Sequence, residues 1–158
     1  MNAKEEFERL GKEEEELAFT SFSHRDAWNI AASIVEKTKN DPQPLGFEIY
    51  LNGLLIFRYF PTGITQDHEY WLYRKYRTVK LREMSSMRMK WMAEMNNSKI
   101  TDWKLDPNNY CLAGGGYPIK IKDTGMIGAI VATGTNDTDE HNKIVEAIRE
   151  YQTGRSSQ

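Results

Sequence analysis

Cysteine and histidine are scarce in this chain. Its 158 residues include a single cysteine, Cys111, and three histidines. One cysteine cannot form an intramolecular disulfide, which excludes a fold built on disulfides. The histidines, His24, His68 and His141, are not spaced as zinc ligands are, so no metal site is expected. Cys111 lies in an apolar setting that raises the pKa of a thiol, and we expect it to be buried and inert.

Long hydrophobic runs and an excess of charge are also missing. No apolar run approaches the roughly 18 residues of a membrane span, and the first residues lack the apolar core of a signal peptide. The 23 acidic and 21 basic residues give a net charge of −2, which argues against a nucleic-acid partner. We expect a soluble cytoplasmic protein without a membrane or nucleic-acid partner.

Charge is unevenly distributed within the predicted single domain, 1–158. Residues 1–16 carry seven glutamates against three basic residues, a net of −4, and predict a peripheral acidic helix. Residues 67–92 carry seven basic residues against three acidic ones, a net of +4. Residues 153–158 are expected to form a frayed tail.

Hydrophobic periodicity predicts an α+β fold. Asn52 and Gly53 separate two apolar runs, the strongest short-range signal for a β-hairpin. Ser23 followed by Asp26 resembles a helix start. We predict a mainly antiparallel sheet of five strands at 17–22, 47–51, 54–60, 117–121 and 126–133. Helices are predicted at 24–40, at 67–92 with a break at Ser85 and Ser86, and at 138–152.

The glycine run 114–116 precedes a strand, whereas dinucleotide and P-loop motifs lead into a helix. Two interpretations stay open: the backbone passes close to another element, or bare N–H groups line a ligand pocket. His141 falls on the apolar stripe of the last predicted helix. It is either a satisfied core histidine or a ligand or acid/base group aimed at a pocket. The Met/Trp stripe at 84, 87, 91 and 95 is interpreted as core or as a contact between subunits.

Several segments together resemble the haem-degrading-domain family, the GlcG/HbpS-like group, and within it a cytosolic branch. The matching segments are 71–75, Ser85, Leu105–Pro107, 114–119, 125–130, Gly134 and 139–141. The resemblance covers about residues 8–152. It implies a profilin-like fold with five antiparallel strands, a homodimer or larger homo-oligomer, and haem as a ligand of some members. Met84 and Ala113 stand where relatives often carry histidine, which leaves His141 as the matching imidazole.

From these observations we expect a small-ligand-binding protein whose pocket lies between the glycine run, the last helix and the basic helix. The ligand would be a haem-like tetrapyrrole or a small anionic metabolite, with haem as the candidate cofactor. The expected ligand-binding residues are Arg74, Lys75, Ser85, Gly115, Gly116 and His141. The alternatives are a haem-degrading enzyme and an oligomeric structural or interaction protein without catalysis. In that last case the acidic N-terminal helix of one subunit would meet the basic helix of its neighbour.

Overall fold

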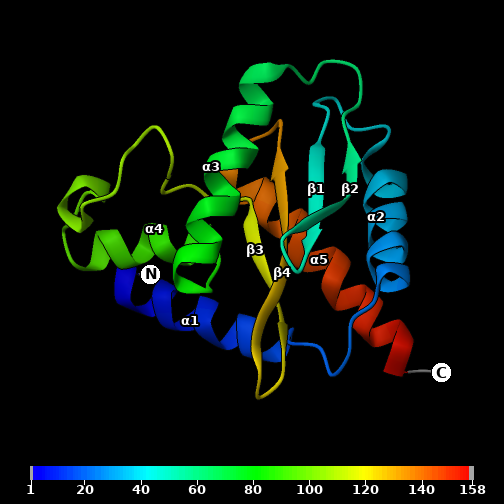
Figure 1. Ribbon diagram of the computed structural model, residues 1–158, viewed down its shortest axis with the longest axis horizontal. Coiled ribbons are helices and arrows are strands. Elements are labelled where there is room, and N and C mark those ends of the chain that lie inside the picture. Colours follow the sequence, from blue (N-terminus) through cyan, green and yellow to red (C-terminus); the bar gives the residue numbers. More distant parts are fainter. Residues whose placement is uncertain (1, 157–158) are drawn as a thin grey trace.

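The computed structural model of the chain describes residues 2–156. One antiparallel sheet is flanked by helices on both faces (Figure 1). The helices are α1 (Ala3–Glu16), α2 (His24–Thr38), α3 (Gln66–Arg82), α4 (Ser86–Met95) and α5 (Asp137–Ser156), with a short 3-10 helix at Ile100–Trp103. The strands are β1 (Gly46–Leu51), β2 (Leu54–Tyr59), β3 (Gly116–Ile121) and β4 (Gly125–Thr133), in the order β2-β1-β4-β3.

The α+β prediction is confirmed, but the five-strand prediction is wrong: the described residues form four strands. The segment 17–22 makes a single parallel bridge, between Phe19 and Ile121. Phe19 donates its N–H to Lys120 and accepts from Lys122, and the ladder goes no further. Its ring is buried and packs edge-on against Phe22, at 4.9 Å between centroids. The apolar content of this segment therefore reflects core packing rather than a strand.

The predicted hairpin and helix starts are confirmed. Asn52 and Gly53 both have positive φ, 51° and 81°, as the tight β1–β2 turn requires. Ser23 and Asp26 form a reciprocal capping box at the start of α2. The predicted break falls between α3 and α4, where Glu83 takes a left-handed conformation and Ser85 caps α4. α5 extends to Ser156, four residues beyond the predicted end, so the expected frayed tail is helical up to that residue.

The two faces of the sheet are covered differently. Phe47 and Ile49 of β1 point into the main hydrophobic core, which α2 and α5 close. Glu48 and Tyr50 alternate with them and lie on the opposite face, which α3 crosses. α3 therefore lies on the more polar side of the sheet, and hollows form along both flanks of this helix.

α1 is less peripheral than its composition predicts. Asn2 and Glu5 form a capping box that fixes its start. The helix packs along α4, where the Arg88 guanidinium lies 4.3 Å from the centre of the Phe7 ring. It buries Glu13 and Glu14, two of its seven glutamates. In the Met/Trp stripe, Met87 is buried within the same chain, with its Cε next to Gly114.

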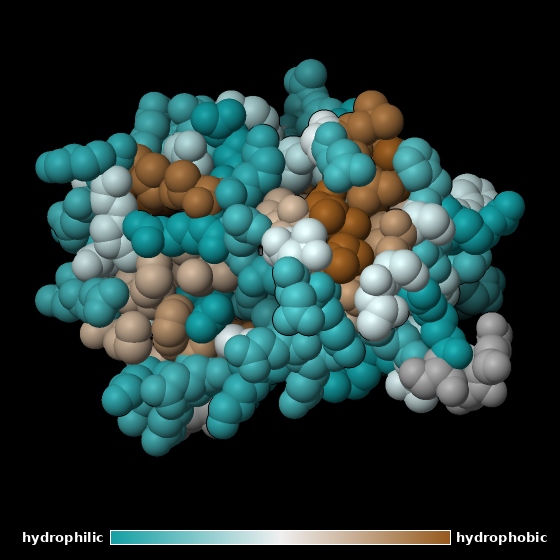
Figure 2. Space-filling view, turned by 60° about the horizontal axis from the view of Figure 1, so that its bottom comes forward, coloured by the Kyte–Doolittle hydropathy of each residue, from teal (hydrophilic) through white to brown (hydrophobic). Residues whose placement is uncertain are grey.

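None of the helices formed by residues 2–156 is long and apolar enough to cross a bilayer. Figure 2 shows a mainly hydrophilic face on which hydrophobic surface is confined to patches. Leu54 and Leu55, at the β1–β2 turn, are among the exposed hydrophobic side chains.

Candidate functional site

A polar cleft lies where the sequence places the expected pocket, between α3, the end of β4 and the start of α5. Its volume is about 340 Å³. The lining residues come from these three elements, from the turn between β4 and α5, and from the position before the glycine run: Asp67, His68, Trp71, Lys75, Ala113, Thr133, Gly134, Thr135, Asp137 and Glu140.

A buried ion pair forms the base of this cleft. The Nζ of Lys75 donates to Oε1 of Glu140 at 2.7 Å and to the carbonyl oxygen of Ala132, also at 2.7 Å. Both side chains of the pair are less than 5% exposed. Oε2 of Glu140 accepts the N–H of Thr135 at 3.0 Å. An ammonium has three N–H donors, and the third finds no oxygen or nitrogen acceptor among the residues that the structure describes; the centre of the Trp71 ring lies 6.0 Å from Nζ.

Gly115 makes room for this ion pair. Its φ is +115°, and a Cβ there would lie 2.7 Å from Nζ of Lys75 and 2.8 Å from the carbonyl oxygen of Ala132. Gly116 donates its N–H to Oγ of Ser86 at 2.9 Å, so that N–H is not free for a ligand. The glycines therefore serve a close approach of the backbone to α3 and α4.

The carboxyl groups of the cleft differ in their pKa. Burial raises the pKa of Glu140, and the Lys75 ammonium offsets only part of that rise. Burial acts in the same direction on Asp137. There the Lys90 ammonium at 2.9 Å and the N–H of Gly114 outweigh it, and the pKa falls below its ordinary value. Asp137 is thus held ionised, whereas Glu140 is the carboxyl closer to taking up a proton.

The structure brings together only part of the predicted site. Lys75 and Gly115 meet at the base of the cleft, whereas Gly116 is engaged with Ser86. The guanidinium of Arg74 lies 3.8 Å from the centre of the Trp71 ring, and Arg74 does not line the cleft. Ser85 is fully buried, where its side chain accepts from the N–H of Arg88 at the start of α4.

His141 faces the interior and not the cleft. It is 2% exposed, and its Nε2 lies 3.0 Å from Oε1 of Glu13 on α1. Its ring is 5.5 Å from the ring of Tyr117, centre to centre. His141 is therefore a core histidine that is only half satisfied, because its buried Nδ1 has no hydrogen-bond partner among the described residues.

The cleft also holds residues that sequence reasoning missed. His68 lines it, and its Nδ1 accepts the N–H of Thr65 at 3.0 Å. The spacing of Thr65 and His68 is that of a capping pair, a signal that could have placed His68 at a helix start. Asp67 and Trp71 lie on the same flank of α3. Ala113, which precedes the glycine run, lines the cleft as well.

No group of three His, Cys, Asp or Glu side chains within residues 2–156 is arranged to hold a metal ion.

Several proteins of known structure share this fold. The crystal structure of the Ybr137w protein superimposes with a TM-score of 0.86 at 21% identity, covering 94% of this chain and 88% of that one. HbpS gives a TM-score of 0.63 at 17% identity, over 83% of this chain and 89% of HbpS. The structure titled PduOC:Heme Complex gives 0.66 at 15% identity, over 82% of this chain and 94% of that one. At these identities the likeness shows the fold.

Sequence comparison identifies the family. The sequence model described as haem degrading protein HbpS-like matches residues 22–149, so the chain belongs to the HbpS-like family. The UPF0303 protein BMEI0598 of Brucella melitensis is 30% identical over 141 residues, which cover 89% of this chain and 83% of the relative. The UPF0303 protein BCAN_A1444 of Brucella canis matches to the same extent. The resemblance inferred from the motifs is confirmed.

Proposed function

We propose that this protein binds a small oxygen-bearing ligand in the cleft between α3 and α5, with Lys75 as the principal donor. The observation that carries the proposal is the buried Lys75 ammonium, which uses two of its three N–H donors on Glu140 and Ala132. A buried charge with unused hydrogen-bonding capacity is costly. A ligand oxygen at the cleft would accept the third N–H and remove that cost.

The lining limits the size and charge of the ligand. A volume of about 340 Å³ is at the lower end of the roughly 300–1,000 Å³ of small-molecule pockets. Three carboxylates line the cleft: Glu140 is paired with Lys75, Asp137 is paired with Lys90, and Asp67 has no ion-pair partner among the described residues. Like charges repel in such a setting, so the ligand carries at most one negative charge. This narrows the anionic metabolite expected from the sequence to a small monoanion or a neutral polar molecule.

Titration of the protein with lactate, propionate and glycerol, followed by ligand-observed NMR, tests the proposal. Lactate has both carboxylate and hydroxyl oxygens, whereas propionate has only carboxylate oxygens and glycerol has only hydroxyl oxygens. We expect saturable lactate binding that the double variant Lys75→Gln/Glu140→Gln weakens at least about tenfold, because a charged hydrogen bond is lost. The variant Glu36→Gln/Lys39→Gln, which removes an exposed ion pair at the C-terminal end of α2, is the matched control. The proposal is wrong if none of the three probes saturates or if both double variants bind alike.

Haem binding is the second candidate function. It is supported by the family and by the fold shared with a protein solved as a heme complex. The cleft itself does not fit a haem: it is small, mainly polar, and has one aromatic wall, Trp71. His68 is the imidazole at its rim, since His141 is buried elsewhere. A haem would therefore not fit inside the cleft, and a haem held by His68 would have to lie over the opening of the cleft.

An absorbance titration with haemin tests this second candidate. Saturation near one haem per chain with a shifted Soret band that His68→Ala abolishes would favour haem held by His68. A linear rise in absorbance without a shift of the Soret band would exclude haem as a specific ligand. Catalytic haem breakdown, the enzyme alternative, would show as Soret loss with iron release once a reductant is added.

Homo-oligomer formation in the cytoplasm belongs to the same proposal. Size-exclusion chromatography with light scattering at low and high salt tests it, because an assembly held by charge dissociates as salt screens the acidic and basic helices. α1 already packs on α4 of its own chain. We therefore expect any assembly to be insensitive to salt and to use the exposed apolar side chains.

A further inference from the structure

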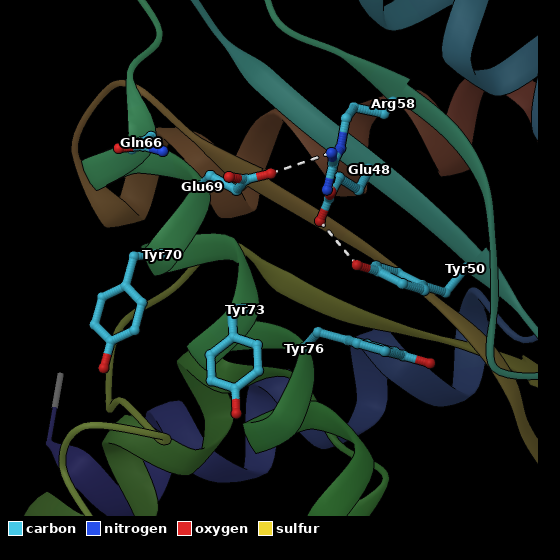
Figure 3. A pocket seen from close by; sticks show the side chains of 8 residues that line it. All are labelled: Glu48, Tyr50, Arg58, Gln66, Glu69, Tyr70, Tyr73 and Tyr76. Carbon is cyan, nitrogen blue, oxygen red and sulfur yellow. Dashed lines mark hydrogen bonds and ion pairs between the residues drawn. The ribbon is translucent and has the colours of Figure 1, made fainter.

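A second, larger hollow lies on the other flank of α3, over strands β1 and β2 (Figure 3). Its volume is about 440 Å³. We call it the tyrosine groove, after the residues that line it: Tyr50, Tyr70, Tyr73 and Tyr76, together with Glu48, Arg58, Gln66 and Glu69. None of these residues lines the cleft described above.

A charged triad lies at one end of the tyrosine groove. Glu48 is 1% exposed, and its Oε2 accepts from Nε of Arg58 at 2.6 Å. Its Oε1 accepts from the hydroxyl of Tyr50 at 3.0 Å. Nη1 of Arg58 also lies 3.1 Å from Oε2 of Glu69 (Figure 3). Glu48 is thus fully engaged, whereas Glu69 is 44% exposed and keeps acceptor capacity toward the groove.

The tyrosines form flat walls at two places. Tyr50 and Tyr76 are stacked 3.7 Å apart with planes 10° from parallel. Tyr70 and Tyr73 lie 6.1 Å apart at 13°. On the flank of α3 the rings already attract cations, since the guanidinium of Arg77 lies 5.3 Å from the Tyr73 ring centre. Rings of this kind bind planar groups by stacking and cations by their negative faces.

We propose that the tyrosine groove is a binding site for a flat aromatic cation, stacked on the tyrosines with its charged group on Glu69. The groove's own lining holds two carboxylates and one guanidinium, whereas Arg74, Arg77 and Lys80, which lie over the rings of Tyr70, Tyr73 and Tyr76, are not part of that lining. Within the lining, the side chain of Glu69 is the carboxylate that is exposed to an incoming group. This favours a cation over an anion of the same shape. The tyrosine groove is separate from the cleft, so this proposal does not depend on the proposed function.

Three probes with the same ring and different charge test this proposal: benzamidine (positive), benzamide (neutral) and benzoate (negative). Isothermal titration of the purified chain should show benzamidine binding tightest. Glu69→Gln should weaken benzamidine about tenfold, the order expected for one charged hydrogen bond, and leave benzamide unchanged. Glu94→Gln, an exposed substitution on α4, is the matched control.

A second pair of variants tests the aromatic wall. Tyr73→Ala should weaken benzamidine and benzamide alike, by several-fold, whereas Tyr73→Phe keeps the ring and the affinity. Lys75→Gln/Glu140→Gln in the cleft should not alter benzamidine binding. Benzoate binding as tightly as benzamidine, no effect of Glu69→Gln, or no saturable binding of benzamidine would each overturn the proposal.

Discussion

The imidazole Nε2 of His141 lies 3.0 Å from Oε1 of Glu13, and this contact joins α5 to α1 across 128 positions of sequence. It turns one of the seven N-terminal glutamates inward. The histidine that the motif resemblance placed at a ligand site is thereby occupied in holding the N-terminal helix on the domain.

Replacing His141 by Ala should therefore destabilise the fold without weakening ligand binding. Glu13 would lose its buried partner, which lowers the free energy of unfolding by about 1–3 kcal/mol. Urea denaturation with an unchanged m-value measures this loss. His24→Ala is the control, since His24 is exposed at the start of α2. A His141→Ala protein of unchanged stability that no longer binds lactate would contradict this role.

Gly115→Ala should be among the most destabilising single methyl additions in the chain. The added Cβ would lie 2.7 Å from Nζ of Lys75, and the residue would keep a φ of +115°. Backbone strain of this kind alone costs on the order of 1–3 kcal/mol. Gly154→Ala, on the open surface of α5, meets no atom within 4 Å. It should raise stability by about 0.5–1 kcal/mol, and thermal unfolding compares the two.

The buried ion pair should show strong coupling in a double-mutant cycle. Lys75→Met leaves Glu140 buried and without its counter-charge, which costs about 3–5 kcal/mol. Lys75→Met/Glu140→Leu removes both charges and should recover much of that loss. Urea denaturation of the four proteins gives the coupling energy. If the double variant is less stable than the single variant by the full cost of Glu140→Leu, the two side chains act independently.

Glu14 gives the fold a dependence on pH. Burial raises the pKa of this carboxyl, and the N–H of Ser85 and the Lys120 ammonium offset only part of the rise. A carboxyl with a raised pKa in the folded state contributes stability that is fully present below its unfolded pKa and is lost as pH rises through the folded value. Glu14→Gln should therefore gain stability over the native chain as pH increases.

Denaturation of the native chain and of Glu14→Gln between about pH 4 and pH 8 measures this difference. Glu15→Gln, at the next and exposed position of α1, is the control. A stability difference that does not change with pH would show that Glu14 does not titrate differently in the folded and unfolded states.

Local signals in the sequence were sufficient for most of the fold. The Asn52–Gly53 turn and the Ser23–Asp26 cap are contacts between near neighbours, so their residue types are enough to predict them. The prediction of a strand around Phe19 was wrong because a segment with one bridge and a well-packed ring has the same apolar pattern as a strand.

The cleft lies against α3 and the start of α5, two of the elements from which the sequence predicted a pocket, but of the predicted residues, all of which the structure describes, only Lys75 lines it. Gly115, also expected in the pocket, lies against the Lys75 ammonium without being part of the lining. Glu140 is 65 positions from Lys75, and no periodicity relates the two. The sequence also could not predict which way His141 points. Its position on the apolar stripe of the helix is the same whether its ring contacts a partner on α1 or a ligand in a pocket.

α3 is the wall shared by the cleft and the tyrosine groove, and the helical repeat separates the two linings. Asp67, His68 and Trp71 face one hollow, whereas Glu69, Tyr70 and Tyr73 face the other. Side chains on opposite flanks of a helix do not meet. Substitutions on one flank of α3 can therefore change one hollow without changing the other. Two proteins that descend from a common ancestor can then share the lining of one hollow and differ in the lining of the other.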